Sequence, residues 1–311
     1  MQEPVKKGSA RMKKIIVLLT TLVLLLSGCG GKNANEIRIV DGRVTEQKLV
    51  HRMLKMLIED RTDFTVSIGE EMTATNAYNE MKKRSYDMYM SYDGTVLTTF
   101  LHHDPSEIPE GMSLFDYTND LFKRQDDMRM VNKLGLDNPY AMAVPGKIKS
   151  QYNLNTISDL VPYAPQLTFC AEHEFFGNEG SMKFDPFVAF YGLDFKSTRP
   201  VDLSLKYSTM ESGNADVTVA YATDGRNKKV QLQILEDDLG FFPEYNGVII
   251  VQQDLFDRLG ENGKQVEEII HLLDNIFTNE SMTDLSYQVD IEEKKVDEVA
   301  RNFLTANGLL K

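Results

Sequence analysis

Short apolar runs of strand length alternate with longer amphipathic segments, and this alternation constrains the fold more than any other feature of the chain. The strand-like runs are 37–40, 64–68, 88–91, 167–171 and 217–221. The segments with apolar residues at helical spacing are 45–60, 73–83, 266–277 and 296–304. Thr45 is expected to cap the first of these helices, because its hydroxyl can accept a bond from the first turn. The alternation predicts α/β lobes with largely parallel sheets.

Composition and charge narrow the class of protein further. The chain has 311 residues, of which 42% are hydrophobic, which suffices for two lobes with buried cores. Its formal net charge is −13, and because the first 28 residues carry +4, the remainder carries −17. So acidic a body repels phosphates and disfavours nucleic-acid binding, whereas it suits a cationic ligand.

The N-terminus has the pattern of a secretory leader. Lys13 and Lys14 precede an apolar run over 15–26, followed by Ser27, Gly28 and Cys29. The run of about 12 residues falls short of the roughly 20 that a membrane-spanning helix needs. The small residues before the cysteine resemble the lipobox of bacterial lipoproteins. This resemblance implies a signal peptide over 1–28, diacylglyceryl attachment to Cys29, a tether over 29–35 and a location on the extracytoplasmic face of the cell membrane.

Alternatives to this interpretation are an ordinary signal peptide or a short anchor, and translation could begin at Met1 or at Met12. If Cys29 is lipidated, Cys170 is the only other cysteine, so the mature chain can form no internal disulfide. Cys170 lies in an apolar run and is expected to be a small buried residue rather than a nucleophile.

Motifs for catalysis or metal binding are weak. The sequence contains no P-loop, no Gly-x-Ser-x-Gly elbow and no His-Glu-x-x-His. His102-His103-Asp104 could supply metal ligands, but adjacent histidines on a loop rarely converge on one ion, and Cys170 and His173 lack a partner pair. We therefore expect no enzyme activity, no metal and no cofactor.

Tyrosine is the residue type that suggests a binding site. The chain has 13 Tyr and no Trp, and several tyrosines adjoin turn-forming residues. These stretches are Tyr92-Asp93-Gly94-Thr95, Asn138-Pro139-Tyr140 and Tyr221-Ala222-Thr223-Asp224-Gly225. A tyrosine ring can attract a cation that offers no hydrogen bond, such as trimethylammonium. The alternative is that these rings complete the edges of the core.

Eight stretches carry a resemblance to a known family. They are 44–47, 92–95, 136–141, 219–226, 235–238, 241–245, 285–290 and 299–304. In this order and spacing the chain resembles, from about Ile37 to Leu310, the substrate-binding proteins of osmoprotectant ABC importers, the glycine betaine, carnitine and choline group. The resemblance implies capture of a quaternary-ammonium solute, with an ABC permease and ATPase as partners.

The same resemblance implies an α/β, two-lobed periplasmic-binding-protein fold of type II with the ligand cleft between the lobes. The first lobe is expected to comprise 36–142 and 243–311, and the second 143–242. Two alternatives remain: a binding protein or sensor for another methylated ammonium compound, and an extracellular enzyme on the same scaffold.

Ligand residues can be carried over position by position. The expected set is Tyr92, Tyr140, Tyr207 and Tyr221 as an aromatic cage, Thr95 for a ligand carboxylate, and Asp93 and Arg43 beside them. Gly42 and Asn178 stand where the family often has Lys and Arg, and Asp93 stands where Thr is usual. These departures predict that choline binds at least as well as glycine betaine, unless Arg43 reaches into the cleft.

Overall fold

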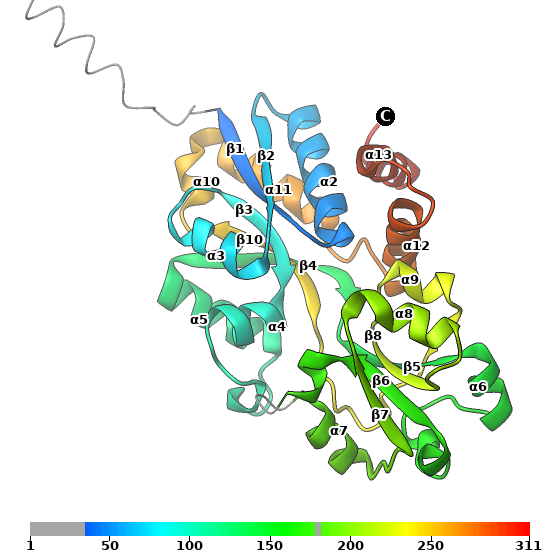
Figure 1. The fold of residues 1–311 in the computed structure, drawn as a ribbon. Coiled ribbons are helices and arrows are strands. Elements are labelled where there is room, and N and C mark those ends of the chain that lie inside the picture. Colours follow the sequence, from blue (N-terminus) through cyan, green and yellow to red (C-terminus); the bar gives the residue numbers. More distant parts are fainter. Residues whose placement is uncertain (1–34, 178–181) are drawn as a thin grey trace, which may run out of the picture. The chain divides into compact units, whose positions relative to one another are not determined.

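The computed structural model describes residues 35–177 and 182–311 (Figure 1). The chain divides into an N-terminal segment, Met1–Glu36, and one compact unit, Ile37–Lys311. The predictions for the signal peptide, Cys29 and Asn178 fall outside the described residues. In the described part of the chain, no helix is both long enough and apolar enough to cross a membrane.

Strands and helices alternate along the compact unit, as the sequence pattern predicts. The strands are β1 (Glu36–Gly42), β2 (Thr65–Met72), β3 (Met88–Tyr92), β4 (Met128–Asp137), β5 (Tyr140–Pro145), β6 (Thr168–Glu172), β7 (Ser197–Val201), β8 (Val217–Tyr221), β9 (Leu232–Ile234) and β10 (Asn246–Gln252). The helices are α2 (Thr45–Arg61), α3 (Ala74–Lys82), α4 (Asp93–Thr95), α5 (Leu114–Asp126), α6 (Gly146–Tyr152), α7 (Phe184–Tyr191), α8 (Leu203–Glu211), α9 (Gly225–Lys229), α10 (Leu255–Arg258), α11 (Gly263–Ile270), α12 (Asn279–Asp290) and α13 (Val296–Ala306).

The strands form two five-stranded sheets. The first has the order β2-β1-β3-β10-β4 and the second β7-β6-β8-β5-β9. Strand β10 is antiparallel to β3 and β4, and β5 is antiparallel to β8 and β9, whereas β6 is parallel to β7 and β8. Strands β1 and β3 are parallel as well, so one strand in each sheet, β10 or β5, runs against its neighbours. The expectation of largely parallel sheets therefore held in part and missed these two reversed strands.

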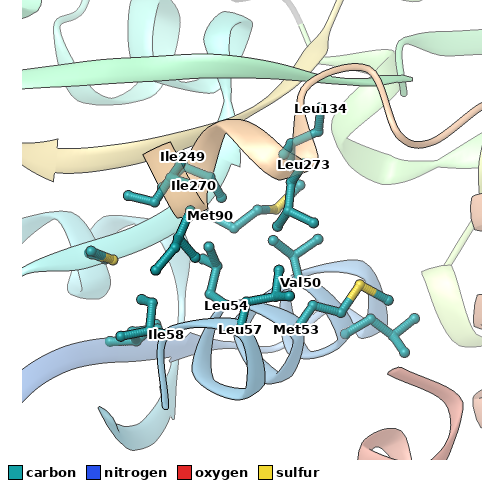
Figure 2. Packing of buried hydrophobic residues seen from close by; sticks show 14 of the residues in the cluster. Val50, Met53, Leu54, Leu57, Ile58, Met90, Leu134, Ile249, Ile270 and Leu273 are labelled. Carbon is teal, nitrogen blue, oxygen red and sulfur yellow. The ribbon is translucent and has the colours of Figure 1, made fainter. Parts of the chain in front are cut away.

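Two apolar clusters cover the faces of the first sheet. Ile37 and Ile39 of β1 pack toward α2, α11 and α13, whereas Val40 packs on the other face with α3 and α5. This alternation follows from the period of two in a strand. Figure 2 shows the first cluster, in which Val50, Met53, Leu54 and Leu57 of α2 meet Ile270 and Leu273.

The chain passes between the sheets twice, once between β4 and β5 and once between β9 and β10. The two crossings lie side by side, since the Asn138 N–H donates to the Tyr245 carbonyl at 3.0 Å. The expected lobe boundary at 142/143 falls inside β5, because Tyr140 already pairs with Tyr221 in the second sheet. The boundary expected at 242/243 lies within the second crossing.

Two details of the predicted helices differ. Val44, not Thr45, is the N-cap residue of α2, and the Thr45 hydroxyl instead donates to Asp290 at 2.5 Å. The predicted helix over 266–277 begins earlier, at Gly263, and ends after a short 3₁₀ turn at Leu273. Beyond that turn, the backbone N–H groups of Asn275 and Phe277 bond to carbonyls of β4 instead of continuing the helix.

Candidate functional site

A cleft of about 990 Å³ lies where strands of the two sheets end. Tyr92 closes β3, Tyr140 opens β5, Tyr221 closes β8, and Tyr245 immediately precedes β10. All four tyrosines line the cleft, together with Glu46, Thr95, Asn138, Asp224, Arg226 and Phe242. Three of the four predicted cage residues are therefore brought together, along with the predicted Thr95.

Tyr92 and Tyr245 form the part of the cleft wall that belongs to the first sheet. Their rings stack with centroids 5.6 Å apart and planes 30° apart. Gly94 makes this arrangement possible, because a Cβ at that position would lie 2.0 Å from Cε2 of Tyr245. The Tyr245 hydroxyl also lies 3.0 Å from the Thr95 hydroxyl, which orients both groups at the cleft.

Tyr140 and Tyr221 form the part that belongs to the second sheet. They face each other as a register pair of β5 and β8, with ring centroids 5.5 Å apart. Phe175 and Phe242 meet the Tyr140 ring edge-on at 5.4 and 6.2 Å and so hold its orientation. Burial raises the pKa of Tyr140 to about 12, so the ring carries a neutral phenol at ordinary pH.

Glu46 is a buried carboxylate in the cleft wall to which the sequence argument assigned no role. Its oxygens accept hydrogen bonds from the hydroxyls of Tyr92 and Thr223, and more weakly from Asn138 Nδ2 at 3.4 and 3.5 Å. Burial raises the pKa of Glu46, although these bonds oppose the shift. The sequence signal that could have revealed this buried carboxylate was the presence of polar residues on the buried face of the helix predicted over 45–60.

Tyr207 does not belong to the set of described residues that line the cleft. Its hydroxyl donates to Asp224 Oδ2 at 2.6 Å, and the ring is only 6% exposed. Arg226 Cζ lies 4.6 Å from its centroid, and Lys206 Nζ lies 5.2 Å from this centroid and 5.1 Å from that of Tyr221. The ring of Tyr207 thus already contacts cationic side chains of the protein itself. The fourth tyrosine that lines the cleft is Tyr245, in place of the predicted Tyr207. Tyr245 lies in a stretch that carried the resemblance, and its position after Pro243 was the available signal.

Asp93 and Arg43 also lie outside the cleft lining of the described chain. Asp93 is fully buried and accepts bonds from the backbone N–H of Asn246 at 2.8 Å and from its side-chain amide at 2.9 Å. Burial raises the pKa of Asp93 to about 7. Asp93 therefore joins the turn after β3 to the start of β10. The predicted Arg43 is exposed.

The described residues hold no group of three metal-ligating side chains. His103 pairs with Glu107 at 2.7 Å and contacts Gln125 at 3.2 Å. Cys170 is completely buried, as predicted, and burial raises the pKa of its thiol to about 11.

Two α/β lobes joined by two crossings, with an aromatic cleft between their sheets, define the class of two-lobed solute-binding proteins. Residues 35–306 match the family described as the substrate binding domain of ABC-type glycine betaine transport system, and the chain belongs to this family. The predicted family and the two-lobed fold are thus confirmed, and the family is one of transport proteins.

Named relatives support the assignment. The chain is 29% identical to the carnitine transport binding protein OpuCC of Listeria monocytogenes, over 94% of this chain and 95% of that protein. It is 27% identical to the ergothioneine transport permease/ergothioneine binding protein EgtU of Helicobacter pylori, over 85% of this chain but only 46% of that protein. A solved structure titled glycine betaine/carnitine/choline ABC transporter superposes with a TM-score of 0.79 at 26% identity, covering 89% of this chain and 99% of that one.

Proposed function

We propose that this chain captures a quaternary-ammonium solute of the betaine, carnitine or choline kind and delivers it to an ABC importer. The observation that carries the proposal is the convergence of Tyr92, Tyr245, Tyr140 and Tyr221 on one cleft. A trimethylammonium group has no N–H to donate, so a protein recognises it through aromatic faces and apolar contact. The four rings offer such faces from both sheets.

The charge of the cleft fits the same ligand. Glu46 and Asp290 place carboxyl groups at its wall, and the body of the chain is strongly acidic. Long-range attraction of this kind raises the rate at which a cation enters a cleft. Aromatic faces and carboxylates are groups that bind and attract a cation, so they support a role in binding.

The partners follow from the family. A permease and an ATPase would receive the loaded protein, and lipidation of Cys29 would hold it at the extracytoplasmic face of the membrane. A ligand that contacts both sheets favours the closed arrangement of the lobes, which is how loaded and empty protein can differ in shape.

Titration calorimetry on the detergent-solubilised full chain tests the proposal. Choline, glycine betaine and carnitine are compared with 3,3-dimethylbutan-1-ol, which has the shape of choline without its charge. We expect at least one ammonium compound to bind, to raise the melting temperature, and to bind far more tightly than the uncharged alcohol. Equal binding of choline and the alcohol would contradict a cage that selects for cations.

Ergothioneine is a second candidate ligand, favoured by the similarity to the Helicobacter pylori protein. It is also a trimethylammonium compound with a carboxylate, so it would use the same cage. Its larger ring system fits within a cleft of about 990 Å³. Adding it to the titration series distinguishes the two candidates, since a binding protein tuned to ergothioneine would prefer it over carnitine.

A further inference from the structure

Cationic side chains are scarce at the cleft. Among the described residues that line it, Lys183 and Arg226 are the only lysine or arginine. Lys183 Nζ donates to the Glu174 carbonyl at 2.7 Å. Arg226 follows Tyr221 by five residues and is the second residue of helix α9. Arg43, which the sequence argument considered, is not among them.

Arg226 is held in place by two neighbours. Its Nε donates to Asp224 Oδ1 at 2.9 Å and its Nη2 to Asp224 Oδ2 at 2.6 Å, which is the bidentate geometry of a strong ion pair. Its guanidinium also lies over the ring of Tyr207 at 4.6 Å. These contacts fix the plane of the guanidinium before any ligand arrives.

The pair is unequally exposed. The side chain of Arg226 is 37% exposed and that of Asp224 only 8%. Within the described part of the chain, the hydrogen bonds of the Arg226 guanidinium use Nε and Nη2 and none uses Nη1. The N–H groups of Nη1 are therefore available to a ligand at the cleft. Burial raises the pKa of Asp224, but hydrogen bonds from Arg226 and Tyr207 outweigh it and hold this pKa below its usual value. The arginine therefore enters the cleft as the open member of a charged pair.

We propose that Arg226 binds the carboxylate of a zwitterionic ligand whose trimethylammonium group occupies the tyrosine cage. The inference rests on the proposed function and narrows its ligand class to betaine-type zwitterions. A guanidinium can share its N–H groups between a protein carboxylate and a ligand carboxylate, and its planar fork suits both. Choline has no carboxylate and would gain nothing from it.

This assignment changes the choice of ligand expected from sequence. Gly42 and Asn178 suggested that cationic partners for a carboxylate are missing, which favoured choline. Arg226 supplies such a partner from a different element, because α9 brings it to the cleft that Tyr221 also lines.

The test compares ligands with and without a carboxylate on matched variants. Choline, glycine betaine and carnitine are titrated into the full chain, into Arg226→Gln and into Lys228→Gln, which removes a cation from the same helix outside the cleft lining. We expect glycine betaine or carnitine to bind the unaltered protein roughly tenfold more tightly than choline, as one charge-assisted bond allows. Arg226→Gln should lose that advantage while choline binds as before or more tightly, since Asp224 is left unpaired. Lys228→Gln should change neither.

Three results would overturn the proposal. If Arg226→Gln weakens choline and the zwitterions equally, the arginine only supports the fold of the wall. If choline binds the unaltered protein more tightly than both zwitterions, the carboxylate has no partner. Binding of none of the three overturns the proposed function as well, which is a different failure. Should Arg226→Gln not fold, Arg226→Lys keeps the charge but not the fork, and a partial loss confined to the zwitterions is then expected.

Discussion

The ring of Tyr245 stacks on the ring of Tyr92, with centroids 5.6 Å apart, and completes the aromatic wall of the first sheet. Tyr245 stands in the second crossing and Tyr92 at the end of β3, so the contact depends on β10 pairing with β3. The fourth ring of the cleft is thus provided by a residue remote in sequence. Tyr207 instead lies inside the second lobe, where it contacts Asp224 and Arg226.

Leucine substitutions distinguish these two roles, because leucine keeps much of the volume of the ring but removes its π face. Tyr245→Leu should weaken binding of the ammonium ligand roughly threefold to thirtyfold, matching about 0.5–2 kcal/mol for one cation–π contact. Tyr207→Leu should reduce stability and leave the affinity for choline, which has no carboxylate for Arg226, within about threefold. Calorimetry on both variants would contradict this assignment if Tyr207→Leu alone abolished binding.

The buried Asp93 should make the protein less stable as pH rises through the weakly acidic range. Its pKa is raised from 3.8 to about 7, so between these values the folded chain holds a proton that the unfolded chain has released. Stability contributed by this proton is present in full below pH 4 and is lost as pH approaches 7, at no more than about 1.4 kcal/mol per pH unit.

Asp93→Asn should remove this component, and urea unfolding at several pH values measures it. Asp120→Asn, a change at an exposed carboxylate, is the matched control and should keep the pH dependence of the unaltered protein. Identical pH profiles for Asp93→Asn and the unaltered protein would show that Asp93 is ionised in the fold.

Lys206 and Glu172 form a buried ion pair behind the cleft wall. Their N–O distance is 2.8 Å, both side chains are almost completely buried, and Glu172 Oε2 has no hydrogen-bond partner among the described residues. Lys206→Met should cost about 3–5 kcal/mol of unfolding free energy, because it leaves a buried carboxylate unpaired.

The double change Lys206→Met with Glu172→Gln should recover most of that loss, since no charge then remains uncompensated. Lys264→Met, in an exposed pair with Glu268, should cost less than about 0.5 kcal/mol. A double variant as unstable as Lys206→Met alone would argue that the lysine acts through packing rather than charge.

Helix α9 of the second lobe touches α12 of the first through a glycine. A Cβ on Gly225 would lie 2.6 Å from the backbone N of Tyr287, so Gly225→Ala must push the two helices apart. We expect at least several-fold weaker ligand binding and a smaller ligand-induced compaction by small-angle scattering. Gly146→Ala, where the nearest atom is 3.9 Å away, is the control. Unchanged affinity in Gly225→Ala would mean that ligand binding does not need this contact.

Cys29→Ala should abolish lipid attachment, because the sulfur that would carry the diacylglyceryl group is gone. The expected result is protein released from the membrane or retained with its leader uncleaved, as seen by fractionation and by mass spectrometry of the N-terminus. Processed Cys29→Ala protein that still fractionates with the membrane would argue for a different anchor.

Local periodicity in the sequence predicted five of the strands and four of the helices in their order. The two-lobed class and the presence of Tyr92, Thr95, Tyr140 and Tyr221 at one cleft were implied by the resemblance to the family, which depends on motifs whose residues lie next to each other in the chain. The sequence did not reveal that β5 and β10 run against their neighbours, because a strand has the same sequence pattern whether it enters its sheet parallel or antiparallel.

Only the tertiary structure decided which rings face the cleft. Tyr207 lies within helix α8 and Tyr245 lies directly before β10, but neither position by itself says whether the ring reaches the cleft. The choice follows from neighbours that are remote in sequence: Arg226 covers the ring of Tyr207, while Gly94 leaves room for that of Tyr245. The same holds for Arg226, whose role as an open cation depends on how deeply its partner Asp224 is buried, and burial is a property of the packed chain rather than of any segment.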